Sequence, residues 1–160
     1  MSTIVRLIIA VVIVVISAAI GAVAAGDALS GWYRGLRQPA FGLPLWGWGV
    51  VGAIYYCAFT VVLFRLLGVT RAGREDPSRF VPLAVTLGIM LGNELWNVVL
   101  FGWHDLFLAF AVLWPFALYV ALVARYVYRR ADRIAGALLG GYAVWLVYDL
   151  AWMYGLWQLN

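Results

Sequence analysis

Five long apolar runs constrain this chain more than any other feature of its sequence. A helix needs roughly 20 apolar residues to cross the hydrocarbon core of a bilayer, and each run meets that length. Hydrophobic residues make up 66% of the chain and charged residues only 11%, which is far from the composition of a soluble domain. We therefore predict a single all-α integral membrane domain over residues 1–160, built as a five-helix transmembrane bundle. The predicted helices span residues 4–25, 45–67, 80–101, 106–128 and 134–156.

Arginines are distributed unevenly between the two sides that this topology implies. If the N-terminus shares a side with the second and fourth connections, that side holds nine of the eleven basic residues, and the other has only Arg34 and Arg37. Basic residues gather on the cytoplasmic side of membrane proteins, so we predict a cytoplasmic N-terminus and a C-terminus on the opposite side. Anionic lipid headgroups account for the net charge of +4, and no nucleic-acid partner is expected. Residues 71–79, RAGREDPSR, are expected to form a solvated connector of mixed charge.

The first connection, residues 26–44, is the longest irregular stretch of the sequence. Unpaired backbone groups in lipid each cost several kcal/mol, so this stretch must lie over the non-cytoplasmic end of the bundle. It carries aromatic residues, arginines and the prolines Pro39 and Pro44. We predict a long loop between the first two helices that covers the bundle as a lid.

Signals for a metal site or a catalytic centre are absent from the sequence. His104 is the only histidine and lies in a short turn, without a second histidine or a cysteine at ligand spacing. Cys57 is the only cysteine, and its place inside the second apolar run predicts a small core residue. We therefore predict no metal, no catalytic residue and no required cofactor, and a binding protein rather than an enzyme.

Polar and aromatic side chains gather on two helix faces within the membrane. Residues three or four positions apart share a face of a helix. This spacing unites two sets, Asn93, Trp96 and Asn97 in the third run, and Tyr142, Trp145, Asp149 and Trp152 in the fifth. Both faces are candidates for the wall of a binding pocket.

Two carboxyl groups, those of Glu94 and Asp149, fall inside the membrane-spanning runs. A carboxylate is costly there, so it should face the bundle interior, a cavity or a partner. The alternative is structural, with the carboxyl group hydrogen-bonded between helices or paired with Arg34 or Arg37. Both interpretations stay open for Asp149, whereas the structural one is favoured for Glu94.

The third run contains the motif Gly88-Ile-Met-Leu-Gly92, in which two glycines are four residues apart. Such spacing lets two helix backbones approach closely in a membrane. The partner helix could belong to a second copy, which would make a homodimer, or to the same chain.

A series of motifs runs in order from Trp32 to Asn160 with consistent spacing. It resembles the signatures of the tryptophan-rich sensory protein and translocator family, called TspO/MBR. The early part is similar to the family pattern W-Y-x-x-L-x-K-P-x-W-x-P-P-x-W-x-F…L-Y, and later parts to N-x-x-W, F-F-G, P-Y-x-x-W and W-R-L-N. The matching residues are Trp32, Tyr33, Leu36, Arg37, Pro39, Phe41, Pro44, Trp46, Tyr56, Asn93, Trp96, Phe101, Gly102, Trp114, Tyr142, Trp145, Trp157, Leu159 and Asn160.

The resemblance implies a five-helix bundle whose first loop covers a pocket for tetrapyrroles, sterols and synthetic aromatic ligands. It also implies that loop aromatics lie flat over the ligand and that Asn93 and indole N–H groups orient its polar atoms. With the two polar helix faces, the expected ligand-binding residues are Trp32, Tyr33, Pro44, Trp46, Trp48, Asn93, Trp96, Asn97, Tyr142, Trp145 and Asp149.

The chain also departs from the family pattern at several positions. Gly52 stands where a tryptophan is usual, and Leu43 and Gly141 each replace a proline. Met153 replaces an asparagine, and Asp149 a small residue. These changes predict a ligand preference that differs from that of other members.

Three functions are compatible with this sequence. The first is a sensor, regulator or transport-linked protein that binds hydrophobic aromatic or polyene ligands, tetrapyrroles (porphyrins) above all. The second is a non-enzymatic subunit of a larger membrane complex, such as one that contains pigments, with a carotenoid or lipid in the pocket. The third is light-dependent porphyrin breakdown, which the loss of a tryptophan at Gly52 disfavours.

Overall fold

The computed structural model of the chain describes residues 1–71, 74–75 and 80–160. Five of its helices are long and apolar enough to cross a membrane, so the predicted fold is confirmed. They are α1 (Thr3–Ala25), α3 (Leu45–Leu67), α4 (Phe80–Asn97), α5 (Leu106–Arg130) and α6 (Arg133–Leu159). The connections contain the 3-10 helix η1 (Gly26–Leu29), α2 (Trp32–Gly35), the paired strands β1 (Thr70–Arg71) and β2 (Arg74–Glu75), and the π-helix η3 (Val98–Gly102). The predicted connector 71–79 lies largely outside the described residues.

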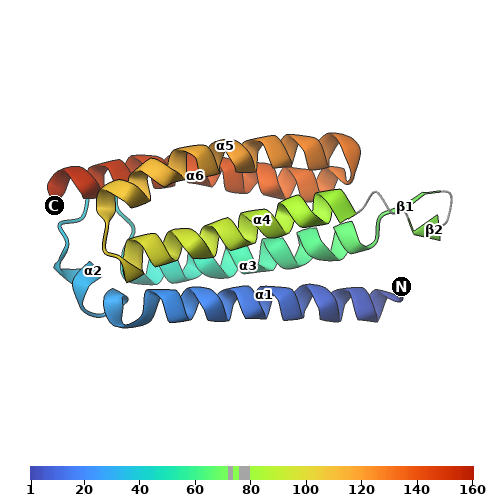
Figure 1. Cartoon of the computed structure of the whole chain (residues 1–160), viewed down its shortest axis with the longest axis horizontal. Coiled ribbons are helices and arrows are strands. Elements are labelled where there is room, and N and C mark those ends of the chain that lie inside the picture. Colours follow the sequence, from blue (N-terminus) through green and yellow to red (C-terminus); the bar gives the residue numbers. More distant parts are fainter. Residues whose placement is uncertain (72–73, 76–79) are drawn as a thin grey trace.

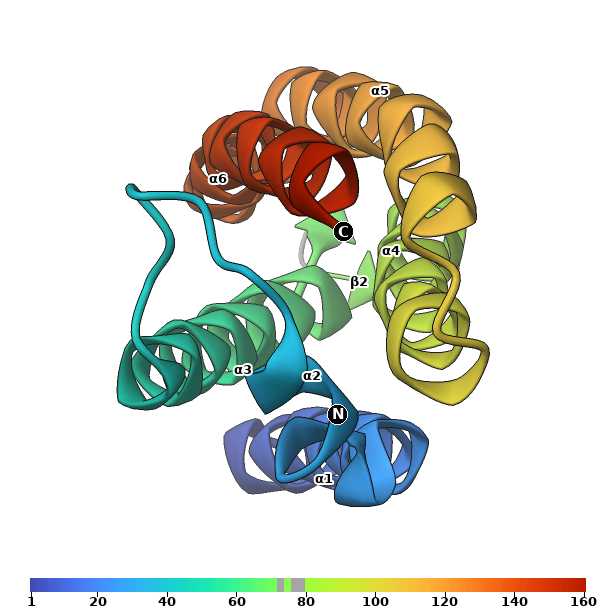
Figure 2. The same ribbon diagram turned by 90° about the vertical axis from the view of Figure 1, so that its left-hand side faces the viewer.

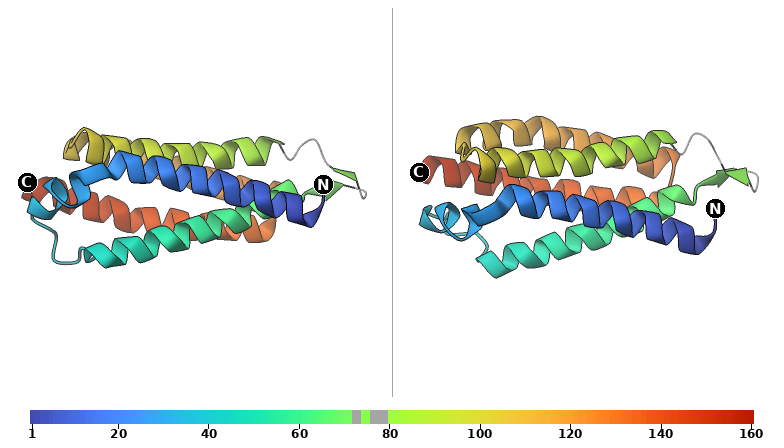
Figure 3. Two further views of the ribbon diagram at one scale, coloured as in Figure 1. Left: turned by 90° about the horizontal axis from the view of Figure 1, so that it is seen from below. Right: turned by 60° about the horizontal axis from the view of Figure 1, so that its bottom comes forward.

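The five long helices run alongside one another in a bundle, and the two chain termini lie at opposite ends of it (Figures 1 and 3). Seen end-on, the helices form a ring in the order α1, α3, α6, α5 and α4 (Figure 2). α5 and α6 pack closely along their length, and α3 packs against α1 and α6. This order brings the two polar faces predicted from the sequence, on α4 and α6, toward a shared interior.

Polar side chains fix where the helices begin. Ser2 Oγ accepts from the N–H of Val5 at 3.3 Å, and Asp105 Oδ1 accepts from the N–H of Leu108 at 2.8 Å. Such caps satisfy backbone donors that have no partner within the helix. The helix ends differ more from the prediction, because α5 extends to Arg130 and α6 to Leu159.

The connection between α1 and α3 is not one long loop as predicted. Its first part is helical, in η1 and α2, and the stretch from Leu36 to Pro44 is irregular, with a turn in which the N–H of Gly42 donates to the carbonyl of Pro39. This stretch passes over the end of the bundle and is tied to α6 (Figure 2). The backbone of Arg37 donates to Asn160 Oδ1 at 2.9 Å and accepts from Asn160 Nδ2 at 3.1 Å, while the Tyr148 hydroxyl donates to the carbonyl of Phe41 at 3.0 Å. The segment is therefore anchored to the same helix that carries Asp149.

At the opposite end of the bundle, a bidentate ion pair links α3 to the residue before α6. Arg65 Nε and Nη2 donate to the two carboxylate oxygens of Asp132, at 2.7 and 2.8 Å. Asp132 also caps α6 by accepting from the N–H of Ala135 at 2.8 Å. These hydrogen bonds, the one from Arg65 first, hold the pKa of Asp132 below its usual value. The carboxylate therefore stays charged at neutral pH and links the two helices.

The position of Cys57 differs from the one that the sequence predicted. Cys57 is exposed on the outer surface of α3, so its prediction as a core residue is wrong. Hydropathy alone misleads here, because in a membrane a small apolar side chain is as stable against lipid as in the core.

The glycines of the α4 motif pack within the chain. A Cβ at Gly88 would collide with the Tyr119 hydroxyl, and one at Gly92 with the ring of Phe116, both on α5. The Tyr119 hydroxyl in turn donates to the carbonyl of Val85 at 2.8 Å. These glycines therefore serve α4–α5 packing, the second of the two alternatives, and are not free to form a homodimer face.

The charge distribution predicts the orientation of this bundle in the membrane. We expect Ser30, at the α2 end, to face the non-cytoplasmic side and Ser2, at the other end, to face the cytoplasm, because most arginines lie at the Ser2 end. The test places a single cysteine at each position in a Cys57→Ser background. Intact cells are then labelled with a membrane-impermeant maleimide, which reacts only with cysteines on the outer side of the membrane. Labelling should reach Ser30→Cys before permeabilisation and Ser2→Cys only after it, and the reverse order would contradict the topology.

Candidate ligand-binding site

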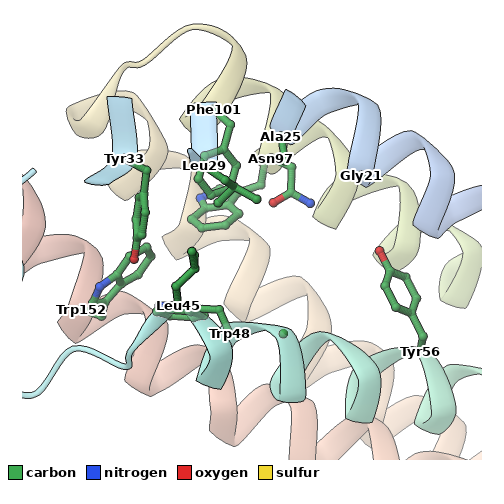
Figure 4. Close-up of a pocket in the computed structure, with 12 residues that line it drawn as sticks. Gly21, Ala25, Leu29, Tyr33, Leu45, Trp48, Tyr56, Asn97, Phe101 and Trp152 are labelled. Atoms are coloured by element: carbon green, nitrogen blue, oxygen red, sulfur yellow. The ribbon is translucent and has the colours of Figure 1, made fainter. Parts of the chain in front are cut away.

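Two adjoining cavities lie between the helices of the bundle, the first near its α2 end and the second reaching farther along it, to Phe59 of α3 and Ala137 of α6. The first, of about 420 Å³, lies between α1, α2, α3, α4 and α6 (Figure 4). The second, of about 560 Å³, lies between α3, α4 and α6. Both volumes fall within the usual range for small-molecule sites. Four residues line both cavities and therefore join them into one candidate site, namely Trp48, Tyr56, Trp96 and Asn97.

Aromatic rings form the wall of the first cavity on the side that faces the connection between α1 and α3. Tyr33 of α2 is buried, and its ring lies 5.9 Å from that of Phe101 and 6.4 Å from that of Trp152. The rings of Trp48 and Trp152 are 4.5 Å apart. Burial raises the pKa of Tyr33, so its hydroxyl stays protonated and donates to Gln38 Oε1 at 3.4 Å. The short helix α2 thus contributes a neutral aromatic surface to the cavity.

The second cavity combines aromatic walls with glycines. The rings of Trp48 and Trp145 meet edge to face at 6.0 Å, and those of Tyr55 and Tyr142 at 5.1 Å. Gly52 lines the cavity opposite α6, and a Cβ there would meet no atom within 4 Å. Gly141 also lines it and has the same free space, so both departures from the family pattern leave this cavity open.

Three buried polar atoms of the second cavity have no hydrogen-bond partner. They are the indole Nε1 of Trp48, the hydroxyl of Tyr55 and Oδ1 of Asp149. Buried polar groups in proteins are nearly always hydrogen-bonded, so each such group calls for an explanation. All three line the same cavity, where a bound molecule could reach them.

Glu94 belongs to a different, fully bonded polar cluster between α1, α3 and α4. Its side chain is 2% exposed, and Oε1 accepts from Ser17 Oγ at 2.7 Å and from the Tyr56 hydroxyl at 3.4 Å. Oε2 accepts from Asn97 Nδ2 at 3.1 Å. A Cβ at Gly21 would collide with Oε2, so this glycine makes room for the carboxyl group. The contacts match the structural interpretation that the sequence favoured for Glu94.

The polar atoms of α4 are largely occupied within the protein. Asn93 Oδ1 accepts from the Tyr142 hydroxyl at 2.9 Å, and Trp96 Nε1 donates to the carbonyl of Ala109 at 2.9 Å. Trp96 therefore offers a ligand its ring face and not its N–H, contrary to the expectation that pocket indoles orient polar ligand atoms. Asn93 and Tyr142 instead join α4 to α6 across the cavity.

The structure brings most of the predicted site residues together. Eight line a cavity, namely Tyr33, Trp48, Asn93, Trp96, Asn97, Tyr142, Trp145 and Asp149. Trp46 is 74% exposed and lines neither cavity, and Pro44 is the exposed residue before α3. Trp32 instead stacks on His104, with ring centroids 4.3 Å apart. These three residues line neither cavity.

Sequence reasoning did not assign Tyr55, Phe59 and Phe101 to the site, although each lines a cavity. Helical spacing from Trp48 could have found two of them, because positions 52, 55 and 59 continue the same face of α3. Residues that could hold a metal are not grouped anywhere in the part of the chain that the structure describes.

The fold and this site define a multi-pass integral membrane protein with aromatic-walled cavities between its helices. The model of the TspO/MBR family matches residues 8–158, which is nearly the whole chain. The chain therefore belongs to the TspO/MBR family. A comparison with curated proteins gives no match.

Proposed function

We propose that the protein is a membrane-embedded binding protein for hydrophobic aromatic or polyene ligands, with tetrapyrroles first among them, and that it acts in sensing or in transport. The observation that carries this proposal is the pair of joined cavities with aromatic walls. Membership of the TspO/MBR family supports it.

The walls suit a flat and largely apolar molecule. Aromatic rings offer large apolar faces and prefer offset-stacked or edge-to-face contact with another ring. Trp48 stands between the two cavities and packs against both Trp145 and Trp152, so its ring contacts whatever fills either space. The segment from Leu36 to Pro44, anchored to α6, runs across the α2 end of the bundle beside α6 and α3 (Figure 2), and we expect it to shield a ligand from the aqueous side.

Direct ligand identification tests the proposal. The protein is purified in its native lipids, and the bound small molecules are identified by mass spectrometry and by absorption spectra. The expected result is a stoichiometric tetrapyrrole, or else a carotenoid or another polyene. Purified protein in nanodiscs should also bind protoporphyrin IX dimethyl ester, with quenching of tryptophan fluorescence. A stoichiometric protein partner, with cavities that take up none of these molecules, would favour the function of a complex subunit and would reject the proposal.

A further inference from the structure

Asp149 is the most unusual group in the second cavity. Its side chain is 8% exposed, it lines the cavity, and its Oδ1 atom has no hydrogen-bond partner. The indole N–H of Trp145, one turn earlier on α6, interacts with the carboxyl group, but Oδ1 still lacks a hydrogen bond. A carboxyl oxygen that is buried and unpaired is costly, and a ligand that supplies a donor removes this cost.

Among the described residues, no basic side chain lies beside this carboxyl group in the second cavity. None of the residues that line the second cavity is an arginine, a lysine or a histidine. Arg34 and Arg37, which the sequence suggested as partners, are both exposed on the connection above. Glu94, in the neighbouring cluster, is itself an acid and supplies no positive charge either. The titratable groups that face the cavity from α3 and α6 are tyrosines, Tyr55 and Tyr56 on one side and Tyr142 on the other.

Two further unpaired atoms complete the polar pattern of the cavity. Trp48 Nε1 is a donor, and the Tyr55 hydroxyl can donate or accept. The cavity therefore offers a donor for a ligand carbonyl and an acceptor for a ligand N–H or O–H. A ligand carboxylate would find the donor but would also meet the Asp149 carboxyl group in an apolar space, where two neighbouring acids cannot both ionise without a large cost.

We propose that Asp149 makes the second cavity selective for flat hydrophobic ligands that carry a hydrogen-bond donor, amines above all, and that it excludes ligands with free carboxylates. This inference rests on the proposed function and narrows it. Within the tetrapyrroles, it favours molecules whose carboxyl groups are esterified or converted to amides over the free acids.

Three probes that share one macrocycle test the selectivity. They are protoporphyrin IX, its dimethyl ester, and its bis-amide with ethylenediamine, which carry two carboxylates, no charge and two ammonium groups, respectively. Affinities are measured in nanodiscs of neutral lipid by quenching of tryptophan fluorescence. The wild-type protein should bind the diamine most tightly, the ester next and the diacid least, with about tenfold between steps.

Asp149→Asn keeps the shape of the side chain and removes its ionisable acid, so it should raise the affinity for the diacid about tenfold and lower that for the diamine about tenfold. The ester should change by less than about threefold, which also shows that the variant is folded. Asp149→Ala serves as a second variant with the same expected directions. Asp27→Asn is the matched control, since Asp27 is an exposed carboxylate at the same end of the bundle and lines neither cavity.

The outcomes separate this inference from the function on which it rests. If the wild-type protein binds the ester but does not discriminate between diacid and diamine, or if both Asp149 variants keep the wild-type ratio, the selectivity is refuted and the binding function stands. If the ester and both charged probes all fail to bind to the wild-type protein, the proposed function itself is refuted.

Discussion

Replacing Trp48 by alanine is expected to weaken ligand binding by about ten- to a hundredfold. This ring lines both cavities and contacts the rings of Trp145 and Trp152, so its loss removes wall surface from the whole site. Burial of a large aromatic surface is worth about 1.4–2.8 kcal/mol, which corresponds to that range of affinity. The measurement is the dissociation constant of protoporphyrin IX dimethyl ester from quenching of the remaining tryptophans.

Trp46 provides the matched control for this variant. It lies two residues before Trp48 on the same helix, but it is 74% exposed and lines neither cavity. Trp46→Ala should therefore change the dissociation constant by less than about twofold. Trp157→Ala should have an equally small effect, because Trp157 stacks on Phe110 of α5 outside the cavities. Equal losses for all three variants would mean that the aromatic residues anchor the protein in the membrane and that the cavities do not hold the ligand.

The fold could be predicted from the sequence because hydropathy and helix length are properties of single segments. The second predicted helix, residues 45–67, coincides with α3, and the first differs from α1 by one residue at its start. Helix ends were less predictable, since they depend on side chains such as Asp132, whose carboxylate both caps α6 and pairs with Arg65. The pattern of apolar residues contains no information about that pair.

The candidate site could be predicted where helical spacing decides which residues share a face. Asn93, Trp96 and Asn97 do line the second cavity together, as their spacing indicated. Trp46 and Trp48 show the limit of prediction from sequence, because both are tryptophans at the start of α3, just after the segment from Leu36 to Pro44. The rotation of α3 decides which of the two side chains lines the cavity. That rotation is set by packing against α1 and α6, which a single sequence does not show.

The chemistry of the two membrane carboxyl groups was the least predictable feature. Glu94 and Asp149 are both buried acids in apolar helices, and sequence alone could not assign different roles to them with certainty. The difference arises from donors on other helices. Ser17 and Tyr56 reach Glu94 from α1 and α3, whereas no side chain reaches Oδ1 of Asp149.

This difference predicts a large effect of Glu94 on stability. Glu94→Ala is expected to lower the free energy of unfolding by about 3 kcal/mol, because it leaves buried donors on three helices without an acceptor. Glu94→Gln should cost much less. Its amide oxygen can still accept from Ser17 and Tyr56, and the Asn97 amide can turn so that its oxygen accepts from the new amide nitrogen.

The free energies of unfolding of both variants are measured by reversible unfolding in mixed micelles, followed by circular dichroism. The control is Leu95→Ala, a change at an exposed apolar residue on the same helix. The expected order of stability is wild type and Leu95→Ala, then Glu94→Gln, then Glu94→Ala well below. Gly21→Ala should also destabilise the protein, since its Cβ would displace the carboxyl group from Ser17. If Glu94→Ala were as stable as Leu95→Ala, the cluster would not hold α1 to the bundle. The carboxyl group would then have to be assigned to ligand binding, beside Asp149.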